Sequence, residues 1–232
     1  VVDSSTINKC NRIILYWDRL ILYGDPENRQ AIYISHLNNP RYFPTPNSLL
    51  FNNERNEPLT DLVKYRDHLV AFTSNTIQAV YGKDPQSFER LTINSDVGCV
   101  QPRTAKAMEN SIAFLAKDGV YVLKSLGISQ TRANVEKIDQ RIQNIIPYGE
   151  EAHAIVADYQ YQLLFPKKGL RFRYYYLMNT WSKDESERFN FSHMESYQHE
   201  ETIVQDGETG ELYVFKPDVW DDDGFVYKDI IE

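Results

Sequence analysis

The five histidines are the side chains to consider first for metal binding or catalysis: His36, His68, His153, His193 and His199. None lies at the spacing of a zinc-binding pair on a helix. The two cysteines, Cys10 and Cys99, also lack the spacing of a metal site. The sequence has neither a nucleophile elbow nor a phosphate-binding or dinucleotide-binding glycine motif. We therefore expect no catalytic residue, no metal and no cofactor, and a protein that is not an enzyme.

Carboxylates could act in pairs, as they do in glycosidases. A sialidase-type repeat should read Ser-x-Asp-x-Gly-x-x-x-Trp, but Ser95-Asp96-Val97-Gly98 begins off-register and lacks the tryptophan. The run Asp221-Asp222-Asp223-Gly224 resembles a cation loop without the full set of alternating ligands. A solvated hairpin turn explains it better. A glycosidase-like protein is thus the third of three hypotheses.

The stretch Arg171–Tyr176 interleaves basic and aromatic residues, a pattern that can stack single-stranded bases. In a strand, however, Arg171 and Arg173 share one face and the aromatic side chains share the other. An amphipathic strand explains the pattern without nucleic acid. The formal net charge of −8 also argues against wrapping DNA, which requires basic patches.

The composition favours a β-rich chain. Sixteen tyrosines suit half-buried pleated surfaces, and no apolar run is long enough to span a membrane. The two cysteines are expected first as buried thiols, and a disulfide between them is the alternative. The first residue is Val1, so we expect residues 1–232 to be a single domain from a longer protein.

A repeat runs along the chain: a short apolar run, a tight polar turn, and a second apolar run. The turns are marked by Asp18, Asp67, Asn110, Asp158 and Asp206. Their spacing of roughly 40–50 residues matches one blade of a β-propeller. Most units add a third strand, for instance Ile77–Tyr81. The fold class predicted is therefore all-β, a propeller-like repeat of about five antiparallel blades.

The middle strands distinguish a propeller from a sandwich. Leu69–Phe72 and Ile112–Leu115 are apolar at consecutive positions, which indicates strands covered on both faces. Stacked blades provide such cover, whereas a sandwich covers one side of each sheet. The sandwich is therefore ranked second. Asp118-Gly119 predicts a hairpin with a type I′ turn and positive φ at both residues.

One stretch departs from the strand pattern. In the segment 134–146 the residues Val135, Ile138, Ile142 and Ile145 would share one helical face. Thr131 is a candidate cap, and Pro147 would end the element. We predict a short amphipathic helix here, inserted between the third and fourth blades.

Two polar connections are expected to carry contacts. Asn38–Glu57 is rich in asparagine and proline, and Lys183–Glu200 is charged. The candidate interaction residues in and beside them are Arg41, Tyr42, Phe43, Trp181, His193 and Tyr197.

Several passages resemble phage virion proteins, including an Asn-Pro-x-Tyr-Phe-Pro loop at Asn39–Pro44. The passages are Leu22–Pro26, Ile34–Pro44, Leu59–Arg66, Leu69–Ile77, Tyr81–Pro85, Gly98–Arg103, Phe114–Tyr121, Leu212–Phe215 and Asp221–Gly224. The family is that of tail tube, stopper or nozzle proteins of short-tailed phages, whose propeller domains form rings around the DNA path. Its members are usually longer than this chain.

The resemblance implies a structural component of a phage tail, assembled in the host cytoplasm and located in the virion. Self-association into a ring, for instance a hexamer, and contact with other tail proteins are the expected interactions. Any contact with DNA would be passive, because an acidic wall repels phosphate. The alternative from another class is a receptor- or glycan-binding propeller, which convergent exposed aromatic side chains would favour.

Overall fold

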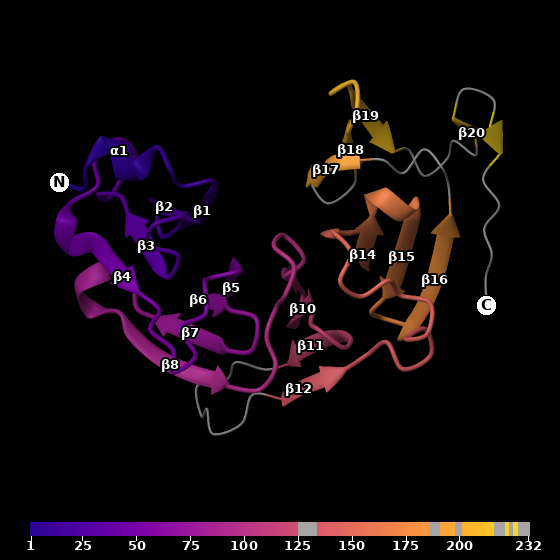
Figure 1. Cartoon of the computed structure of the whole chain (residues 1–232), viewed down its shortest axis with the longest axis horizontal. Helices are drawn as coiled ribbons and strands as arrows, with labels where there is room; N and C mark the ends of the chain where they lie inside the picture. The colour runs from indigo at the N-terminus through magenta and orange to yellow at the C-terminus, as the bar shows by residue number, and fades with distance from the viewer. Residues whose placement is uncertain (125–133, 186–190, 198–200, 216–220, 223–224, 227–232) are drawn as a thin grey trace. The chain divides into compact units, whose positions relative to one another are not determined.

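The computed structural model describes residues 1–232 except 125–133, 186–190, 198–200, 216–220, 223–224 and 227–232. The fold is all-β and of the β-propeller class, with five blades (Figure 1). Helical structure in the described residues is confined to short turns: α1 (Ser4–Ile7), η1 (Thr45–Asn47), η2 (Pro85–Ser87) and η3 (Pro166–Lys168). No helix in these parts of the chain is long and apolar enough to cross a membrane.

Each blade is an antiparallel sheet whose strands pair with their neighbours in sequence. The first blade has β1 (Arg12–Tyr16), β2 (Arg19–Tyr23), β3 (Ala31–Ile34) and β4 (Ser48–Leu50). The second has β5 (Asp61–Tyr65), β6 (His68–Phe72), β7 (Ile77–Tyr81) and β8 (Glu89–Asn94). The third has β9 (Lys106–Met108), β10 (Ser111–Leu115), β11 (Val120–Lys124) and β12 (Asn134–Lys137).

The fourth blade has β13 (His153–Ala157), β14 (Gln160–Phe165), β15 (Leu170–Tyr175) and β16 (Thr180–Glu185). The fifth has three strands in the described residues: β17 (Phe191–Tyr197), β18 (Glu201–Asp206) and β19 (Leu212–Phe215). A separate antiparallel pair is formed by β20 (Asp221–Asp222), which begins the acidic run, and β21 (Phe225–Val226). The predicted strands around all five marker turns are confirmed.

The tight turns obtain their geometry without glycine. Trp17 and Asp18 connect β1 to β2 with φ of 45° and 55°, and Asp158 and Tyr159 connect β13 to β14 with φ of 49° and 58°. These values place non-glycine residues in the left-handed region, as a type I′ turn requires. At Asp118-Gly119 the hairpin is present, but neither residue has positive φ, so the predicted turn type is wrong there. Residues 116–119 form a longer connection between β10 and β11, and this connection does not require positive φ at residues 118 and 119.

The predicted helix at 134–146 is wrong. Its first residues form β12 beside β11, and the rest form turns. The buried Asp139 explains the change, because its Oδ2 accepts hydrogen bonds from Val120 N (2.9 Å) and the Tyr148 hydroxyl. Ile138 N also donates to Val120 O at 2.9 Å. These tertiary bonds outweigh the helical periodicity of the isoleucines. Thr131, the expected cap, lies outside the described residues.

The predicted loop at 183–200 is wrong for its described residues, because 183–185 belong to β16 and 191–197 to β17, while 186–190 and 198–200 lie outside the described residues. On β16, the carboxylate of Asp184 binds two arginines of β15, with Arg171 Nε and Arg173 Nη2 each 2.7 Å from one oxygen. This pairing confirms that Arg171 and Arg173 share one face of an amphipathic strand. Charge in this segment therefore indicates a polar sheet face rather than a loop.

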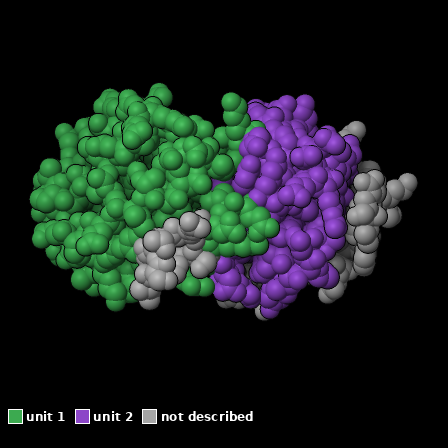
Figure 2. Space-filling view, turned by 90° about the horizontal axis from the view of Figure 1, so that it is seen from below, with its two compact units in different colours: residues 1–100, 115–117, 123–136 green, residues 101–114, 118–122, 137–232 purple. Residues whose placement is uncertain are grey.

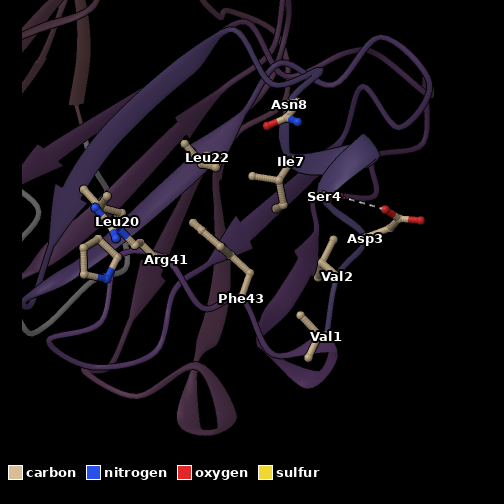
Figure 3. A pocket seen from close by; sticks show the side chains of 11 residues that line it. Val1, Val2, Asp3, Ser4, Ile7, Asn8, Leu20, Leu22, Arg41 and Phe43 are labelled. Carbon is tan, nitrogen blue, oxygen red and sulfur yellow. Dashed lines mark hydrogen bonds between the residues drawn. The ribbon is translucent and has the colours of Figure 1, made fainter.

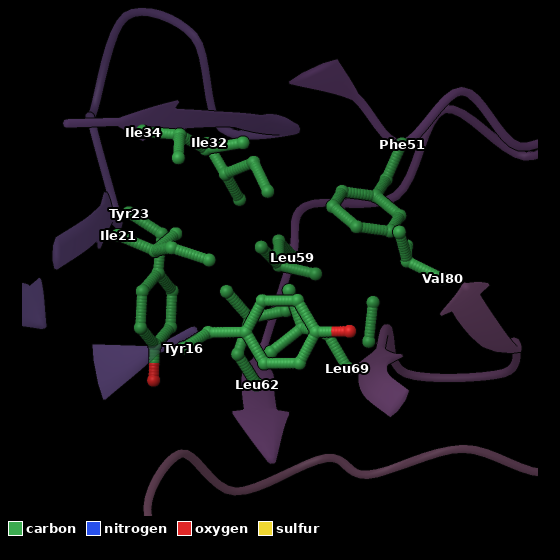
Figure 4. Close-up of a cluster of buried hydrophobic side chains, with 11 residues drawn as sticks. Tyr16, Ile21, Tyr23, Ile32, Ile34, Phe51, Leu59, Leu62, Leu69 and Val80 are labelled. Atoms are coloured by element: carbon green, nitrogen blue, oxygen red, sulfur yellow. The ribbon is translucent and has the colours of Figure 1, made fainter. Parts of the chain in front are cut away.

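The described chain divides into two compact units (Figure 2). One unit contains the first two blades, and the other contains the last two, while the third blade contributes residues to both. The core of the first unit lies between its two blades and gathers Tyr16, Ile21, Phe51, Leu62 and Leu69 (Figure 4). The second unit has a smaller cluster between β13–β14 and β17–β18.

Middle strands are covered on both faces, as the consecutive apolar residues predicted. Every residue of Leu69–Phe72 and of Ile112–Leu115 is buried. The middle strand of the first blade, β2, differs: Ile21 and Tyr23 are buried, whereas Leu20 and Leu22 are only half-buried. One face of the first blade is therefore less covered than the corresponding faces elsewhere.

Candidate interaction surface on the first blade

Side chains of β1 and β2 alternate between the two faces of the first blade. Ile14, Tyr16, Ile21 and Tyr23 point toward the second blade, where they join its core. Their neighbours on the opposite face are Ile13, Leu15, Leu20 and Leu22, and we call this the leading face. Ile13 pairs with Leu22 and Leu15 with Leu20, so the four side chains form one patch.

The leading face is apolar and open. Ile13 and Leu15 are both 60% exposed, although Ile14 between them is half-buried and Tyr16 is buried. Isolated exposed apolar residues are common on protein surfaces. Here the exposed Ile13 and Leu15 are in register with the half-buried Leu22 and Leu20, and together they form a contiguous patch of the kind that marks interaction sites.

The equivalent face of the second blade shows how such a surface packs elsewhere in the repeat. Its turn Tyr65-Arg66-Asp67-His68 aligns with Tyr16-Trp17-Asp18-Arg19, so Leu62, Leu69 and Ala71 occupy the positions of Ile13, Leu20 and Leu22. These three residues are 4%, 0% and 3% exposed, because the first blade packs on them. The leading face thus repeats a surface that, one blade later, is covered by a sheet.

Residues Val1–Cys10 cover the outer part of the first blade. Asp3 caps the short helix α1, accepting a hydrogen bond from Ser5 N at 2.9 Å. Val2 N donates to Phe43 O at 2.8 Å, which fixes the segment against the loop after β3. Val2, Ile7 and Cys10 then pack around Ala31, Tyr33 and Phe43. This segment leaves β1 uncovered.

A groove of about 710 Å³ lies between this segment and β2. Its floor is apolar, formed by Ile7, Leu20, Leu22 and Phe43, whose side chains point toward a common space (Figure 3). Arg41 supplies a cation at one end. The carboxylate in its lining, Asp3, is already used as the helix cap. The groove is suited to apolar side chains more than to acid–base chemistry.

The polar groups around Asp25, elsewhere on the first blade, are mutually satisfied. Asp25 is buried and accepts hydrogen bonds from the Tyr33 hydroxyl (2.7 Å), Glu27 N (3.0 Å) and Asn28 Nδ2 (3.2 Å). Burial raises the pKa of Asp25, but these hydrogen bonds outweigh it and the pKa is lowered. Burial and the nearby Asp25 charge raise the pKa of Cys10 to about 11. The thiol is thus a poor nucleophile at neutral pH.

The predicted interaction residues separate into two groups. Arg41, Tyr42 and Phe43 lie together beside the groove: Arg41 and Tyr42 are exposed, and Phe43 is buried as an anchor. Trp181 is not on a loop but is buried on β16, where its Nε1 donates to Ile138 O at 2.9 Å.

The other two predicted residues, His193 and Tyr197, lie on β17 rather than on a loop, opposite Gln205 and Glu201 of β18. Their side chains are outside the described set. Of the six predicted residues, Arg41 and Phe43 line the groove. Ile13 and Leu15, which the sequence analysis did not name as candidates, were missed as surface residues.

Among the described residues, no group of three or more His, Cys, Asp or Glu side chains could hold a metal ion. Cys10 and Cys99, which are both described, are not joined by a disulfide. What the first blade offers is an apolar surface with one guanidinium at its margin.

No protein-family profile matches the chain, and no curated protein matches it in sequence. Solved structures are similar to it in fold. PorZ of Porphyromonas gingivalis, a surface component of the type-IX secretion system, matches with a TM-score of 0.58 and 15% identity over 92% of this chain. The extracellular domain of the one-component system BT4673 of B. thetaiotaomicron matches with a TM-score of 0.60 and 10% identity over 96%.

YCF48 bound to a D1 peptide matches with a TM-score of 0.60 and 11% identity over 92% of this chain. The aligned region is only 25% of PorZ, 28% of the BT4673 domain and 66% of YCF48. The chain therefore spans about a quarter of the first two proteins and two thirds of the third. At these identities the likenesses establish the β-propeller fold, and the fold alone.

Proposed function

We propose that the chain is a non-enzymatic structural module that acts through protein–protein assembly, as a component of a phage tail. The observation that carries the proposal is the open leading face, with Ile13 and Leu15 exposed on β1. Burial of apolar surface releases about 25 cal/mol per Å², so such a face gains free energy when a partner covers it. The passages that resemble phage tail proteins supply the setting.

The exposed aromatic residues support assembly over glycan binding. A glycan site needs several such rings in one concave site. Tyr42 follows β3, Tyr159 forms the turn after β13, and Tyr213 lies on β19, so these exposed rings belong to three separate elements. Within the groove on the first blade, the aromatic side chain is Phe43, which is buried against the N-terminal segment.

The groove also gives little support to hydrolysis. A glycosidase needs two carboxyl groups flanking the scissile bond. Asp3 provides one carboxylate, and two hydrogen-bonded neighbours, Ser4 and Ser5, occupy it. The negative net charge of −8 is compatible with a wall along which DNA passes without binding.

Labelling of virions tests the proposal. Antibodies raised against residues 1–232 are expected to label the tails of purified particles of the phage that encodes the chain, with particles lacking the protein as control. Mass spectrometry of the same particles should detect its peptides. Absence from purified particles would overturn the phage-tail assignment, and strong, specific binding on a glycan array would replace assembly with recognition.

A further inference from the structure

We propose that two turns at one end of the fourth blade bind a protein segment that presents apolar side chains flanked by lysine or arginine. The surface consists of Tyr159, Tyr176, Leu177 and Met178, and we call it the turn patch. This inference rests on the proposed assembly function and deepens it, because it names a contact surface and the chemistry of its partner. The patch and the residues that flank it all belong to the same compact unit.

The turn patch is apolar and exposed. Leu177 and Met178, which lie between β15 and β16, are 65% and 71% exposed, and Tyr159, which lies between β13 and β14, is 58% exposed. Tyr176 is half-buried, and its ring meets that of Tyr159 edge-on with the centroids 6.2 Å apart. Two turns that are separate in sequence thus form one apolar surface, and contiguous patches of this kind mark interaction sites.

Hydrogen bonds hold the two turns in place. Tyr176 N donates to Tyr159 O at 3.3 Å and so joins one turn to the other. Asn179, which ends the second turn, has a φ of 54°, and its Oδ1 accepts a hydrogen bond from the hydroxyl of the buried Tyr174 at 2.9 Å. A surface that is already ordered loses less conformational entropy when a partner binds to it.

Acidic side chains flank the turn patch. Asp158 precedes Tyr159 in its turn, and the charge of Glu109, in the turn between β9 and β10, adds to burial in raising the pKa of Tyr176. Both carboxylates are exposed, and neither forms an ion pair within the described residues. The three turns contain no lysine, arginine or histidine. The rim of the patch is therefore negative, and it favours a partner with positive charge.

The negative rim distinguishes this partner from other occupants. Membrane surfaces that attract proteins by charge carry anionic lipids, which acidic side chains repel. A second copy of this chain has a net charge of −8, so two copies repel one another on average. A segment with lysine or arginine beside an apolar residue can bury apolar surface against Leu177 and Met178, and its cation can lie over the exposed ring of Tyr159.

Peptide selection tests the inference with a defined probe. A library of short random peptides displayed on filamentous phage is selected on the folded chain and counter-selected on the double variant Leu177→Ser, Met178→Ser. We expect the enriched peptides to carry a net positive charge and an apolar residue next to lysine or arginine. The inference is overturned by a lack of enrichment over the counter-selection, and equally by enrichment of acidic peptides.

Fluorescence anisotropy of the most enriched peptide then measures what each part of the surface contributes. The variant Leu177→Ser, Met178→Ser should weaken binding by about tenfold or more, since a few central contacts carry most of the binding energy. The variant Glu109→Gln, Asp158→Asn should weaken binding by only about threefold but should remove most of its dependence on salt concentration, because charges at a rim act mainly by long-range attraction. Asparagine is chosen at residue 158 because it tolerates the positive φ found there.

Two substitutions on β8 serve as matched controls. Leu91 is an exposed apolar residue and Glu89 an exposed acidic one, so Leu91→Ser and Glu89→Gln should leave peptide binding unchanged. Equal losses in Leu91→Ser and in the patch variant would contradict the inference, as would a charge variant that keeps the salt dependence of the parent chain. Circular dichroism and thermal melting check that each variant folds.

Two further measurements address the other occupants. Co-sedimentation with vesicles of phosphatidylcholine and phosphatidylglycerol should show no binding. Sedimentation velocity should show the same oligomeric state for the parent chain and for Leu177→Ser, Met178→Ser. Vesicle binding, or self-association that the double variant abolishes, would assign the patch to a membrane or to a second copy instead. The virion-labelling result decides the phage-tail assignment separately, because the peptide measurements need no virion.

Discussion

Between the first and second blades the contact is almost wholly apolar, whereas the fourth blade turns a partly charged face toward the fifth. The first contact gathers eleven buried apolar residues. In the second, Leu164 lies in register with Arg171 and Asp184, so the Arg171–Asp184–Arg173 cluster shares the face that packs near Met194. Asp184 is buried, and both arginines are largely so.

The difference shows that one repeat can build its blade contacts in two ways. An apolar contact is stabilised by buried area and tolerates exchange among residues of similar volume. A charged cluster adds little net stability, because desolvation offsets attraction, but the loss of one partner is costly. The stability of the contact between the fourth and fifth blades is therefore expected to be more sensitive to single substitutions in the charged cluster. It should depend less on how tightly the side chains pack.

The largest effect is expected for Asp184→Ala. The substitution removes the carboxylate that Arg171 and Arg173 share, and we expect the free energy of unfolding to fall by about 3–5 kcal/mol. Urea denaturation followed by circular dichroism measures it. The triple variant Arg171→Met, Asp184→Leu, Arg173→Met should recover most of the loss. If the triple variant is as unstable as Asp184→Ala, the cluster has a structural role beyond charge compensation.

Leu69→Ala probes the apolar contact. Leu69 is fully buried among Tyr16, Ile21 and Leu62, so its truncation leaves a cavity and should cost about 2–5 kcal/mol. Leu15→Ala serves as control at low protein concentration, where its exposed side chain should change stability by less than about 0.5 kcal/mol. Equal losses in the two variants would show that the leading face is already covered.

Tyr16→Phe tests a polar group at the edge of the apolar contact. The Tyr16 hydroxyl lies 2.9 Å from both Asp67 O and Gly82 O, and it can donate to one of them at a time. Its removal should cost about 1 kcal/mol, the net value of one hydrogen bond. A neutral result in chemical denaturation would mean that water replaces the hydroxyl at no cost.

The smallest effect is expected from Glu57, which lies in the connection between the first two blades. Its carboxylate should make the stability of the protein depend on pH. Burial raises the pKa of Glu57, but hydrogen bonds from Thr73 Oγ1 (2.6 Å) and Asn75 N (3.1 Å) outweigh it and the pKa is lowered. Because the pKa of Glu57 is lower in the folded state, its carboxylate stabilises the fold at pH values above the unfolded-state pKa near 4.5. This stabilisation is lost as the pH falls through the folded-state pKa.

Thermal melting at pH 7 and at successively lower pH below 4.5 measures this contribution. Glu57→Gln should reduce the difference in Tm between the two ends of the series, with Glu54→Gln on the same connection as control. A pH profile that is identical in the parent chain and Glu57→Gln would contradict the assignment.

The sequence predicts the inner and middle strands well, because consecutive apolar residues such as Leu69–Phe72 identify a strand covered on both sides. It does not predict the outer strands β8 and β16, whose exposed or charged residues resemble loops until a neighbouring strand pairs with them. The prediction of a helix at 134–146 was wrong because hydrophobic periodicity does not show the hydrogen bonds that Asp139 makes with Val120 and Tyr148.

The candidate surface was only partly predictable. Arg41, Tyr42 and Phe43 were named from an asparagine- and proline-rich connection; Arg41 and Phe43 line the groove, and their role as contact residues stays a prediction. Ile13 and Leu15 were not named, because an apolar strand has the same residue types whether a neighbouring sheet covers it or solvent contacts it. Distinguishing the two requires knowing what packs on each face of the sheet, and the residue types alone do not show this.

The pairing of every blade strand with its neighbour in sequence has a consequence for how the chain is made. Short loops close at small entropic cost, so each hairpin can form as soon as both of its strands have left the ribosome. We expect the blades to fold one after another during translation, each new sheet being templated by the one before it.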